Sequence, residues 1–291
     1  MLGGTATIAN PASASAPVAS PDFGYWISEA SKLLEAKAPN YDGALFCAGK
    51  AVEAAGSDVE WARARNADGI AQFHLGKLDV AIAAFTTIAE RFSGSIDADR
   101  RYWHARALIN KGIALGALGR SEEAIAVYED LLARFGTATE PALREQVAGA
   151  LRNKGVRLGA LGRSEEAIAV YDDLFARFGT ATEPALREQI SVALRNKGIA
   201  LGAFGRSEEA IAVYDDLLAR FGTATEPALR EEVAVALRNK GIALGALGRS
   251  EEAIAVYDDL LARFGTATEP AAPGSEAIGA VDRNRQAGAA L

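Results

Sequence analysis

The amino-acid sequence predicts an all-α protein, a solenoid of helical hairpins stacked in a row. Glycine, proline and the tripeptide Ser-Glu-Glu recur at regular intervals along the chain. Between them, apolar residues are spaced three and four residues apart, as on one face of an α-helix. Self-similarity at a fixed period is typical of repeat proteins. The ten residues GRSEEAIAVY occur four times, each copy 43 residues after the last, at 119–128, 162–171, 205–214 and 248–257.

The chain divides into a partial helical hairpin at 22–53 and five full units of 43 residues. The first full unit is divergent, and the last four are close copies of one another. Units 140–182 and 183–225 differ at only seven positions, which are 147, 148, 149, 156, 157, 161 and 175. The five full units are 54–96, 97–139, 140–182, 183–225 and 226–268.

Two segments flank these units. Residues 1–21 are rich in Ala, Ser and Pro and are predicted to be disordered. After Pro270 the repeat pattern ends, and 269–291 is predicted to be a mostly disordered tail. A short helix over 275–289 would have an apolar face too thin to seal the last repeat, which leaves that repeat open for self-association.

The first helix of a unit is illustrated by 183–225. Thr182 is predicted to cap it, with Glu183 and Pro184 in the first turn, where a carboxylate and a proline are both favoured. At about 1.5 Å per residue, a helix of roughly 22 residues is about 33 Å long. Gly205 ends it. Its apolar or small stripe comprises Leu186, Ile190, Leu194, Gly198, Leu201 and Phe204.

The second helix of the unit is predicted to begin after Ser207, whose hydroxyl would cap it. Glu208 and Glu209 then occupy the positive first turn. Gly222 follows the helix and is predicted to be a left-handed C-cap. The apolar stripe comprises Ala210, Ile211, Tyr214, Leu217, Leu218 and Phe221.

Composition and charge limit the classes of function. The net charge is −7, and the charges within each repeat are interleaved, which argues against a nucleic-acid partner. Cys47 is the only cysteine, so an intrachain disulfide is excluded and a reducing compartment is expected. The N-terminus lacks the basic and apolar regions of a signal peptide, and no apolar run could span a bilayer. We therefore expect a cytoplasmic protein that does not bind membranes.

The repeats resemble the tetratricopeptide family. In unit 97–139 the resemblance lies in Leu108, Gly112, Leu115, Ala124 and Tyr128, and it extends clearly over 54–268 and weakly over 22–53. HEAT and armadillo repeats have similar periods, but the twelve-residue spacing from glycine to alanine disfavours them. The resemblance implies a right-handed α-solenoid in which the glycine faces the alanine where the two helices cross. This pair recurs as Gly69/Ala81, Gly112/Ala124, Gly155/Ala167, Gly198/Ala210 and Gly241/Ala253.

The chain departs from the usual family pattern in three ways. The unit is nine residues longer than the usual 34, which makes it similar to kinesin-light-chain-type arrays and to tandem arrays in bacterial signalling proteins. Glycine replaces the terminal proline, at 136, 179, 222 and 265. Lysine precedes the packing glycine where an apolar residue is common, at Lys111, Lys154, Lys197 and Lys240.

The resemblance implies that the first helices line a concave binding groove. Asparagine offers a donor and an acceptor to an extended peptide, and arginine can hold a carboxylate bidentately. The predicted ligand-binding ladder is Asn110, Asn153, Asn196 and Asn239, with Arg152, Arg195 and Arg238 beside it. In an alternative interpretation, the asparagines only bridge neighbouring helices and duplication has copied neutral residues. Apolar residues replace the second asparagine of the family's peptide clamp, which argues against chaperone tails; they are Ile113, Val156, Ile199 and Ile242.

No catalytic constellation is evident. His74 and His104 lie in different units without a partner at metal-ligand spacing, and Cys47 resembles packing filler rather than a nucleophile. No enzyme activity, cofactor or metal is expected. The leading hypothesis is a non-catalytic scaffold that binds a protein or peptide in its groove. A regulatory arm of a larger signalling system and a nucleic-acid-binding solenoid are the alternatives.

Overall fold

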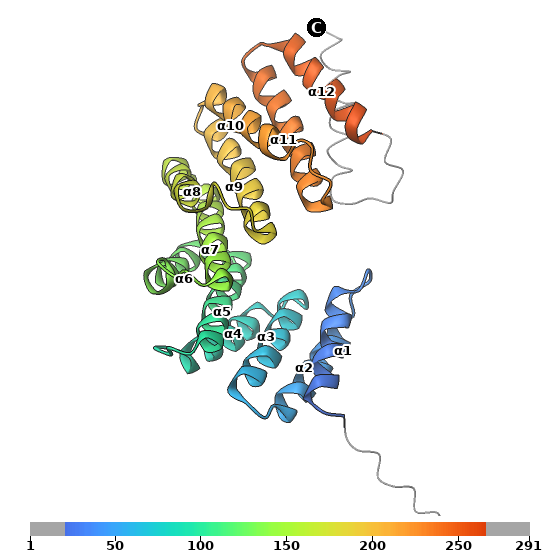
Figure 1. Ribbon diagram of the computed structural model, residues 1–291, viewed down its shortest axis with the longest axis vertical. Helices are drawn as coiled ribbons and strands as arrows, with labels where there is room; N and C mark the ends of the chain where they lie inside the picture. Colours follow the sequence, from blue (N-terminus) through green and yellow to red (C-terminus); the bar gives the residue numbers. More distant parts are fainter. Residues whose placement is uncertain (1–20, 266–291) are drawn as a thin grey trace, which may run out of the picture.

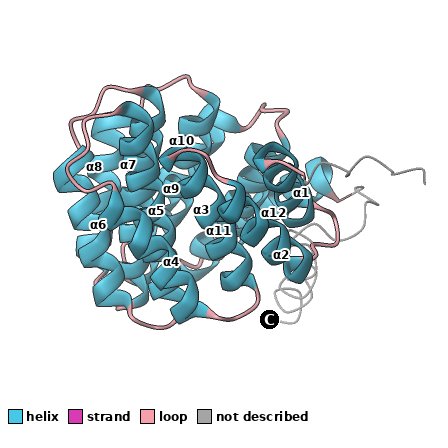
Figure 2. Cartoon of the chain, turned by 90° about the horizontal axis from the view of Figure 1, so that it is seen from below, coloured by secondary structure: helices cyan, strands magenta, loops and turns pink. Residues whose placement is uncertain are grey.

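The computed structural model describes residues 21–265 and confirms the all-α solenoid. This part contains twelve helices and no strands (Figures 1 and 2). The predicted tails, 1–21 and 269–291, lie outside the described residues except for Pro21, as does the helix considered over 275–289. The helices are α1 (Phe23–Glu35), α2 (Tyr41–Ala54), α3 (Asp58–His74), α4 (Leu78–Arg91), α5 (Ala98–Ala117), α6 (Ser121–Phe135), α7 (Pro141–Ala160), α8 (Ser164–Phe178), α9 (Pro184–Ala203), α10 (Ser207–Phe221), α11 (Pro227–Ala246) and α12 (Ser250–Phe264).

The helices follow one another along an open arc, with the α1–α2 and α11–α12 pairs at its two ends (Figure 1). Each helix packs against the next one in the chain. Across repeats, the backbones of the first helices α3, α5, α7, α9 and α11 also pack against one another, whereas the backbones of the described second helices lie further apart, and side chains join them only at their ends. The first helices therefore occupy the tighter, inner side of the arc. A continuous apolar core runs between the two layers from Ala62 to Leu260.

The first helices begin differently from the prediction. In α9 the N-cap residue is Glu183, not Thr182, so the predicted threonine cap is wrong. The Glu183 carboxylate accepts a hydrogen bond from the Thr182 backbone N–H at 3.0 Å and pairs with Arg144 of the preceding repeat at 2.6 Å. The first residue of this helix is therefore determined by a contact between two repeats. A local sequence pattern cannot predict such a contact, because the two residues are far apart in the chain.

The second helices also lack the predicted hydroxyl cap. Ser207 is the first residue of α10, Arg206 occupies the N-cap position, and no side chain caps the helix. The turn is instead closed by the Arg206 backbone N–H, which donates to the Leu201 carbonyl at 2.8 Å. The Arg206 guanidinium pairs with Glu209 in the first turn at 2.6 Å.

In the four close copies, left-handed glycine occurs within the hairpin turn, at Gly119, Gly162, Gly205 and Gly248, rather than at the exit of the hairpin. Gly205 has φ +80° and follows α9, where a side chain would be strained. Gly222 has φ −58°, which is right-handed, so the predicted left-handed C-cap is wrong. Its N–H donates to the Leu218 carbonyl at 2.8 Å and continues the helical pattern for one more residue.

The close crossing within each hairpin involves a glycine and an aromatic ring. A Cβ placed on Gly198 would lie 2.4 Å from Cε1 of Tyr214, which is buried. The predicted partner, Ala210, is buried too, but it is not the group that requires glycine. In the divergent unit Gly69 meets Phe85 in the same way, at 2.6 Å. The glycine is therefore required by the ring that packs on it.

Ion pairs connect consecutive repeats, and they account for three of the four unexpected lysines. Lys154 on α7 reaches back to Glu129 on α6 at 2.8 Å, and Lys197 and Lys240 make the equivalent pairs with Asp172 and Asp215. The cap glutamates accept from an arginine of the preceding repeat. These pairs are Arg101–Glu140, Arg144–Glu183 and Arg187–Glu226.

Candidate functional site

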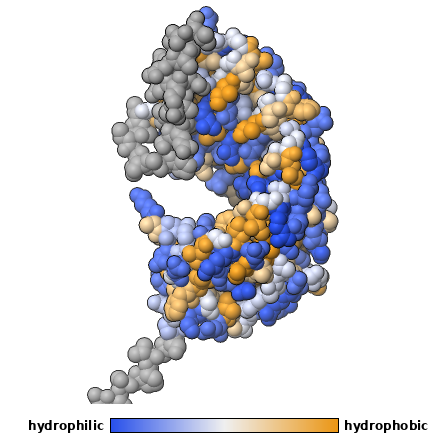
Figure 3. Space-filling model, turned by 180° about the vertical axis from the view of Figure 1, so that it is seen from behind, coloured by the Kyte–Doolittle hydropathy of each residue, from blue (hydrophilic) through white to orange (hydrophobic). Residues whose placement is uncertain are grey.

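The inner face of the arc presents a row of exposed isoleucines. Each follows the packing glycine of its helix by one residue and therefore lies about 100° around the helix from the hairpin contact. Ile113, Ile199 and Ile242 are 40%, 49% and 50% exposed, and Val156 completes the row half-buried. Apolar residues also gather in patches along the arc in the space-filling view (Figure 3). This isoleucine row offers apolar surface that the fold itself does not use.

The asparagine ladder reaches from each repeat to the one before it. Asn110 Nδ2 donates to Asn66 Oδ1 of the preceding unit at 2.7 Å. The other three asparagine side chains lie near tyrosine hydroxyl groups of the preceding repeat, Asn153 near Tyr128, Asn196 near Tyr171 and Asn239 near Tyr214. The ladder thus lies where neighbouring repeats meet. The Nδ2 atoms of two rungs, Asn153 and Asn239, are buried and have no hydrogen-bond partner among the described residues.

The tyrosines that meet this ladder stay neutral over the physiological range. Burial raises the pKa of Tyr128 and Tyr171 well above the ordinary value of 10. Burial likewise raises the pKa of Tyr214 to about 12. The hydroxyl groups therefore keep their protons, and each can both donate and accept a hydrogen bond.

The three ladder arginines have different surroundings, although their helices are nearly identical. Arg195 Nε lies 3.0 Å from Oε2 of Glu232, which makes an ion pair, although neither of these two buried atoms has a hydrogen-bond partner among the described residues. Arg238 Nε donates to Asn239 Oδ1 at 3.3 Å. Arg152 Nε is buried without a hydrogen-bond partner among the described residues, and burial lowers the pKa of this guanidinium. The ladder is therefore not a set of equivalent rungs.

Two further residues of the inner face were missed by the sequence reasoning. Arg157 stands where the other close copies have alanine, and its guanidinium lies over Gly116, where a Cβ would come within 2.7 Å of Nη1. Glu232 stands where the two preceding units have glutamine. A comparison of charge between the copies could have found both residues, because Arg157 is the only charge change among the seven differences between 140–182 and 183–225.

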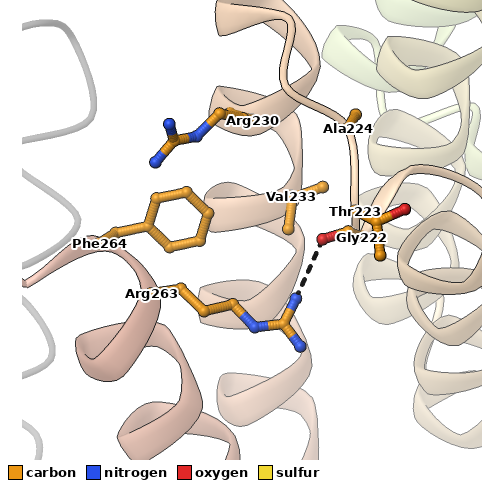
Figure 4. A pocket seen from close by; sticks show the side chains of 7 residues that line it. All are labelled: Gly222, Thr223, Ala224, Arg230, Val233, Arg263 and Phe264. Carbon is orange, nitrogen blue, oxygen red and sulfur yellow. Dashed lines mark hydrogen bonds between the residues drawn. The ribbon is translucent and has the colours of Figure 1, made fainter.

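A shallow pocket lies at the last described repeat (Figure 4). In it, Arg263 Nη1 donates to the Gly222 carbonyl at 3.3 Å, and the Arg230 guanidinium lies 5.6 Å from the Phe264 ring centroid. The same arginine-to-carbonyl contact joins earlier repeats, for example Arg220 to Gly179 at 2.7 Å. The pocket is therefore a repeat junction. Its lining is Gly222, Thr223, Ala224, Arg230, Val233, Arg263 and Phe264.

The histidines belong to the packing of the arc. His74 stacks on Tyr41 with ring centroids 4.6 Å apart, and His104 is buried edge-on to Phe135. Between residues 21 and 265 the structure brings no three His, Cys, Asp or Glu side chains together in a way that could hold a metal ion. In the same part of the chain, none of the helices combines the length and apolarity needed to cross a bilayer.

Comparison with known proteins gives a consistent picture of the repeats. A family model described as tetratricopeptide repeat matches four overlapping stretches, 67–139, 109–182, 152–225 and 195–268. A sequence search among curated proteins found no match.

Solved structures share the fold at low sequence identity. The putative kinesin light chain TPR-like repeats of Podosopora anserina are 14% identical with a TM-score of 0.57, over 74% of this chain and 100% of that one. BtubC (BKLC) from P. vanneervenii is 14% identical with a TM-score of 0.62, over 87% and 96%. A Rap protein, solved in complex with Competence and Sporulation Factor, is 13% identical with a TM-score of 0.54, over 82% and 64%.

Proposed function

The chain belongs to the tetratricopeptide repeat family, and from this premise we propose that it is a non-catalytic scaffold that binds a peptide or helix of a partner protein along the inner face of its arc. The isoleucine row carries this proposal. Ile113 on α5, Ile199 on α9 and Ile242 on α11 each expose 40% to 50% of their surface. Apolar side chains that are exposed together on one face are typical of interaction sites. The Rap protein, a structural neighbour, was solved with a bound factor, which supports a ligand-binding role for an arc of this fold.

The polar ladder is proposed to supply direction and register to the bound segment. The asparagines and arginines stand on the same helices as the isoleucine row and are half-buried, so a ligand would contact their free faces without displacing the core. Amides suit the backbone of a peptide, and guanidinium groups suit its carboxylates. The proposed contact residues are Asn110, Asn153, Asn196, Asn239, Arg152, Arg195 and Arg238.

A selection from a randomised twelve-residue peptide display library tests this function. The double variant Ile199→Asp with Ile242→Asp places charges on the row and is expected to lose the peptides that the unchanged protein selects. The matched control is Val80→Glu on the outer helix α4. Val80 is 49% exposed, and the later units carry glutamate at its position (Glu123, Glu166, Glu209 and Glu252).

The control is expected to retain binding, because its surface lies in the outer layer. Far-UV circular dichroism confirms that both variants are folded. Equal loss of binding in the double variant and in Val80→Glu, or retention of binding in both, contradicts the inner-face proposal.

A further inference from the structure

The last described repeat, formed by α11 and α12 at one end of the arc, has an apolar face that no described repeat covers (Figure 1). Ile254 on α12 is 47% exposed. In the three preceding repeats, the next repeat covers the equivalent side chain and leaves only 5% to 6% of it exposed; these residues are Ile125, Ile168 and Ile211. The residue type is the same in all four repeats, so the difference in exposure is due to the covering repeat.

Two further apolar residues are uncovered in the same place. Ala234 on α11 is half-buried, although the equivalent residues of the three preceding repeats are 0% exposed. Phe264 is half-buried too, whereas its equivalents are buried. Leu261 lies on the same side of α12 as Ile254, because seven residues are close to two turns of an α-helix. We name the surface formed by these four residues the open end; it consists of Ala234, Ile254, Leu261 and Phe264.

Opposite charges flank the open end. Glu251 lies in the first turn of α12. At the other end of this helix, the Arg230 guanidinium lies 5.6 Å from the ring centroid of Phe264. Because α12 has 15 residues, about 20 Å separate the acidic from the basic group along the helix axis.

In the earlier repeats, both charges have partners in the repeat that follows. Glu208, the equivalent of Glu251, lies 2.9 Å from the Arg249 guanidinium of the last repeat. The arginines equivalent to Arg230 pair with the cap glutamate of the next repeat. No described repeat follows α12, so these two contacts are not made within residues 21–265. A surface that covers the open end should therefore offer one basic group, one acidic group and apolar side chains between them.

We propose that the open end binds the open end of a second copy of this chain, in an antiparallel dimer with two-fold symmetry. Ile254 and Leu261 lie three residues before and four residues after Tyr257, the middle residue of α12. A two-fold axis through the middle of α12 therefore places Ile254 against Leu261 of the partner subunit. It also brings Glu251 to the end of the helix where Arg230 of the partner subunit lies. The surface is thus complementary to itself, as a two-fold interface between identical chains requires.

The size of the face predicts a weak and reversible dimer. The 20 residues of α11 and the 15 of α12 form helices about 30 and 22 Å long. Packed helices lie about 8–10 Å apart, so one face measures about 25 Å by 20 Å. Two such faces bury about 1,000 Å² together, which is near the lower limit for a specific interface. We therefore expect a dissociation constant of about 10 μM.

Two other surfaces of the chain fit the open end less well. The N-terminal helix α1 has 13 residues, whereas the inner helix that covers this face in the close copies has 20, so α1 would leave part of it uncovered. The chain's own segment 269–291 lacks large apolar residues in the register of the repeat. In place of Leu229, Val233, Leu237 and Leu244, it has Ala272, Glu276, Ala280 and Ala287 at 43 residues further on.

Sedimentation equilibrium of the full chain tests the dimer at concentrations from about 1 to about 200 μM, which bracket the expected dissociation constant. The unchanged protein is expected to pass from monomer to dimer over this range. Ile254→Glu places a charge on the open end of both copies and should weaken self-association more than about a hundredfold. The matched control is Val80→Glu on α4, where the side chain is 49% exposed. This control should dimerise as the unchanged protein does.

Charge reversal tests the two-fold arrangement. Glu251→Arg alone and Arg230→Glu alone each bring like charges together and should weaken self-association about tenfold. An equimolar mixture of these two variants should recover the affinity of the unchanged protein, because every arginine then faces a glutamate. Far-UV circular dichroism confirms that the variants are folded. A mixture that associates no better than the single variants would refute the antiparallel arrangement.

Two outcomes would overturn the dimer itself. One is a full chain that stays monomeric up to the highest concentration, and the other is an Ile254→Glu variant that dimerises like Val80→Glu. Hydrogen exchange on the dilute monomer tests the alternative that 269–291 covers the open end, where Glu269 stands 39 residues after Arg230. Protection of the amides of 269–291 in the monomer would make this segment the occupant and refute the second copy. The groove function is tested separately by the peptide selection.

Discussion

Adding one carbon to Gly198 should loosen the hairpin at its closest crossing. The new Cβ in Gly198→Ala would lie 2.4 Å from Cε1 and 2.5 Å from Cζ of Tyr214, whereas carbon atoms in contact are normally about 3.5–4.0 Å apart. The ring must therefore move by about 1 Å or more. It is only 3% exposed, so it cannot turn outward into solvent, and the two helices must separate.

The expected magnitude follows from two opposing effects. Overpacking of a buried site costs about 1–3 kcal/mol, while alanine gains up to about 1 kcal/mol over glycine within a helix. Gly202 lies one turn further along α9, and a Cβ there would have no neighbour within 4 Å. Gly202→Ala should therefore show only the gain. The two variants should differ in the free energy of unfolding by about 1–3 kcal/mol, with Gly198→Ala the less stable.

Urea denaturation followed by far-UV circular dichroism measures this difference from the two midpoints at an unchanged slope. Because both substitutions lie in the same helix, the limited cooperativity of a repeat array affects them alike. Equal shifts of the midpoint in the two variants would refute the glycine–tyrosine crossing. Lys197→Leu is not a suitable control, since Lys197 pairs with Asp172 of the preceding repeat.

Three further predictions follow from the same contacts. In-frame deletion of 183–225 should leave a folded, shorter helical protein with a lower midpoint, because 140–182 then meets 226–268 through an equivalent junction; loss of the helical signal would contradict the modular account. Burial raises the pKa of Glu232, so its charged form lowers stability as the pH rises through that pKa. Glu232→Gln should therefore be more stable than the wild type at neutral pH and equal to it well below 4.5, and a pH-independent difference would disagree. Burial lowers the pKa of His104 below 6.5, so the stability that His104 contributes is present above 6.5 and lost as the pH falls through the lowered pKa; an NMR titration midpoint at or above 6.5 would contradict this.

The sequence was sufficient to predict the fold because the same helical pattern occurs once in each of five consecutive units. Capping and packing rules applied within one unit gave the wrong residue where the structure depends on contacts with other segments. Thr182 was the better capping residue by type, but Arg144 of the preceding repeat pairs with Glu183 at the cap position. Gly198 was correctly predicted to lie at a close crossing. Its partner is Tyr214, because a ring sixteen residues away reaches further across the crossing than the alanine opposite does.

The candidate site was less predictable than the fold. Repetition made Arg152 and Arg195 look equivalent in sequence, whereas Arg195 has a carboxylate, that of Glu232, within 3.0 Å and Arg152 faces the position of Gln189, which carries no charge. The difference arises from the residues at the facing positions on the next inner helix, Gln189 and Glu232. Gln189 stands 37 residues after Arg152 (189 minus 152), and Glu232 stands 37 residues after Arg195 (232 minus 195). That relation becomes visible only when α7, α9 and α11 are placed side by side.

Site-specific photocrosslinking tests most directly the central claim that partners bind the inner face. A benzophenone amino acid is placed at Ala203, which is exposed on the inner helix α9, or at Ala212, which is exposed on the outer helix α10. Each protein is irradiated with a peptide from the library selection, and the adducts are measured by mass spectrometry. Binding in the groove predicts adducts from position 203 and none from position 212. Adducts from position 212 alone, or in equal yield from both, would contradict the claim.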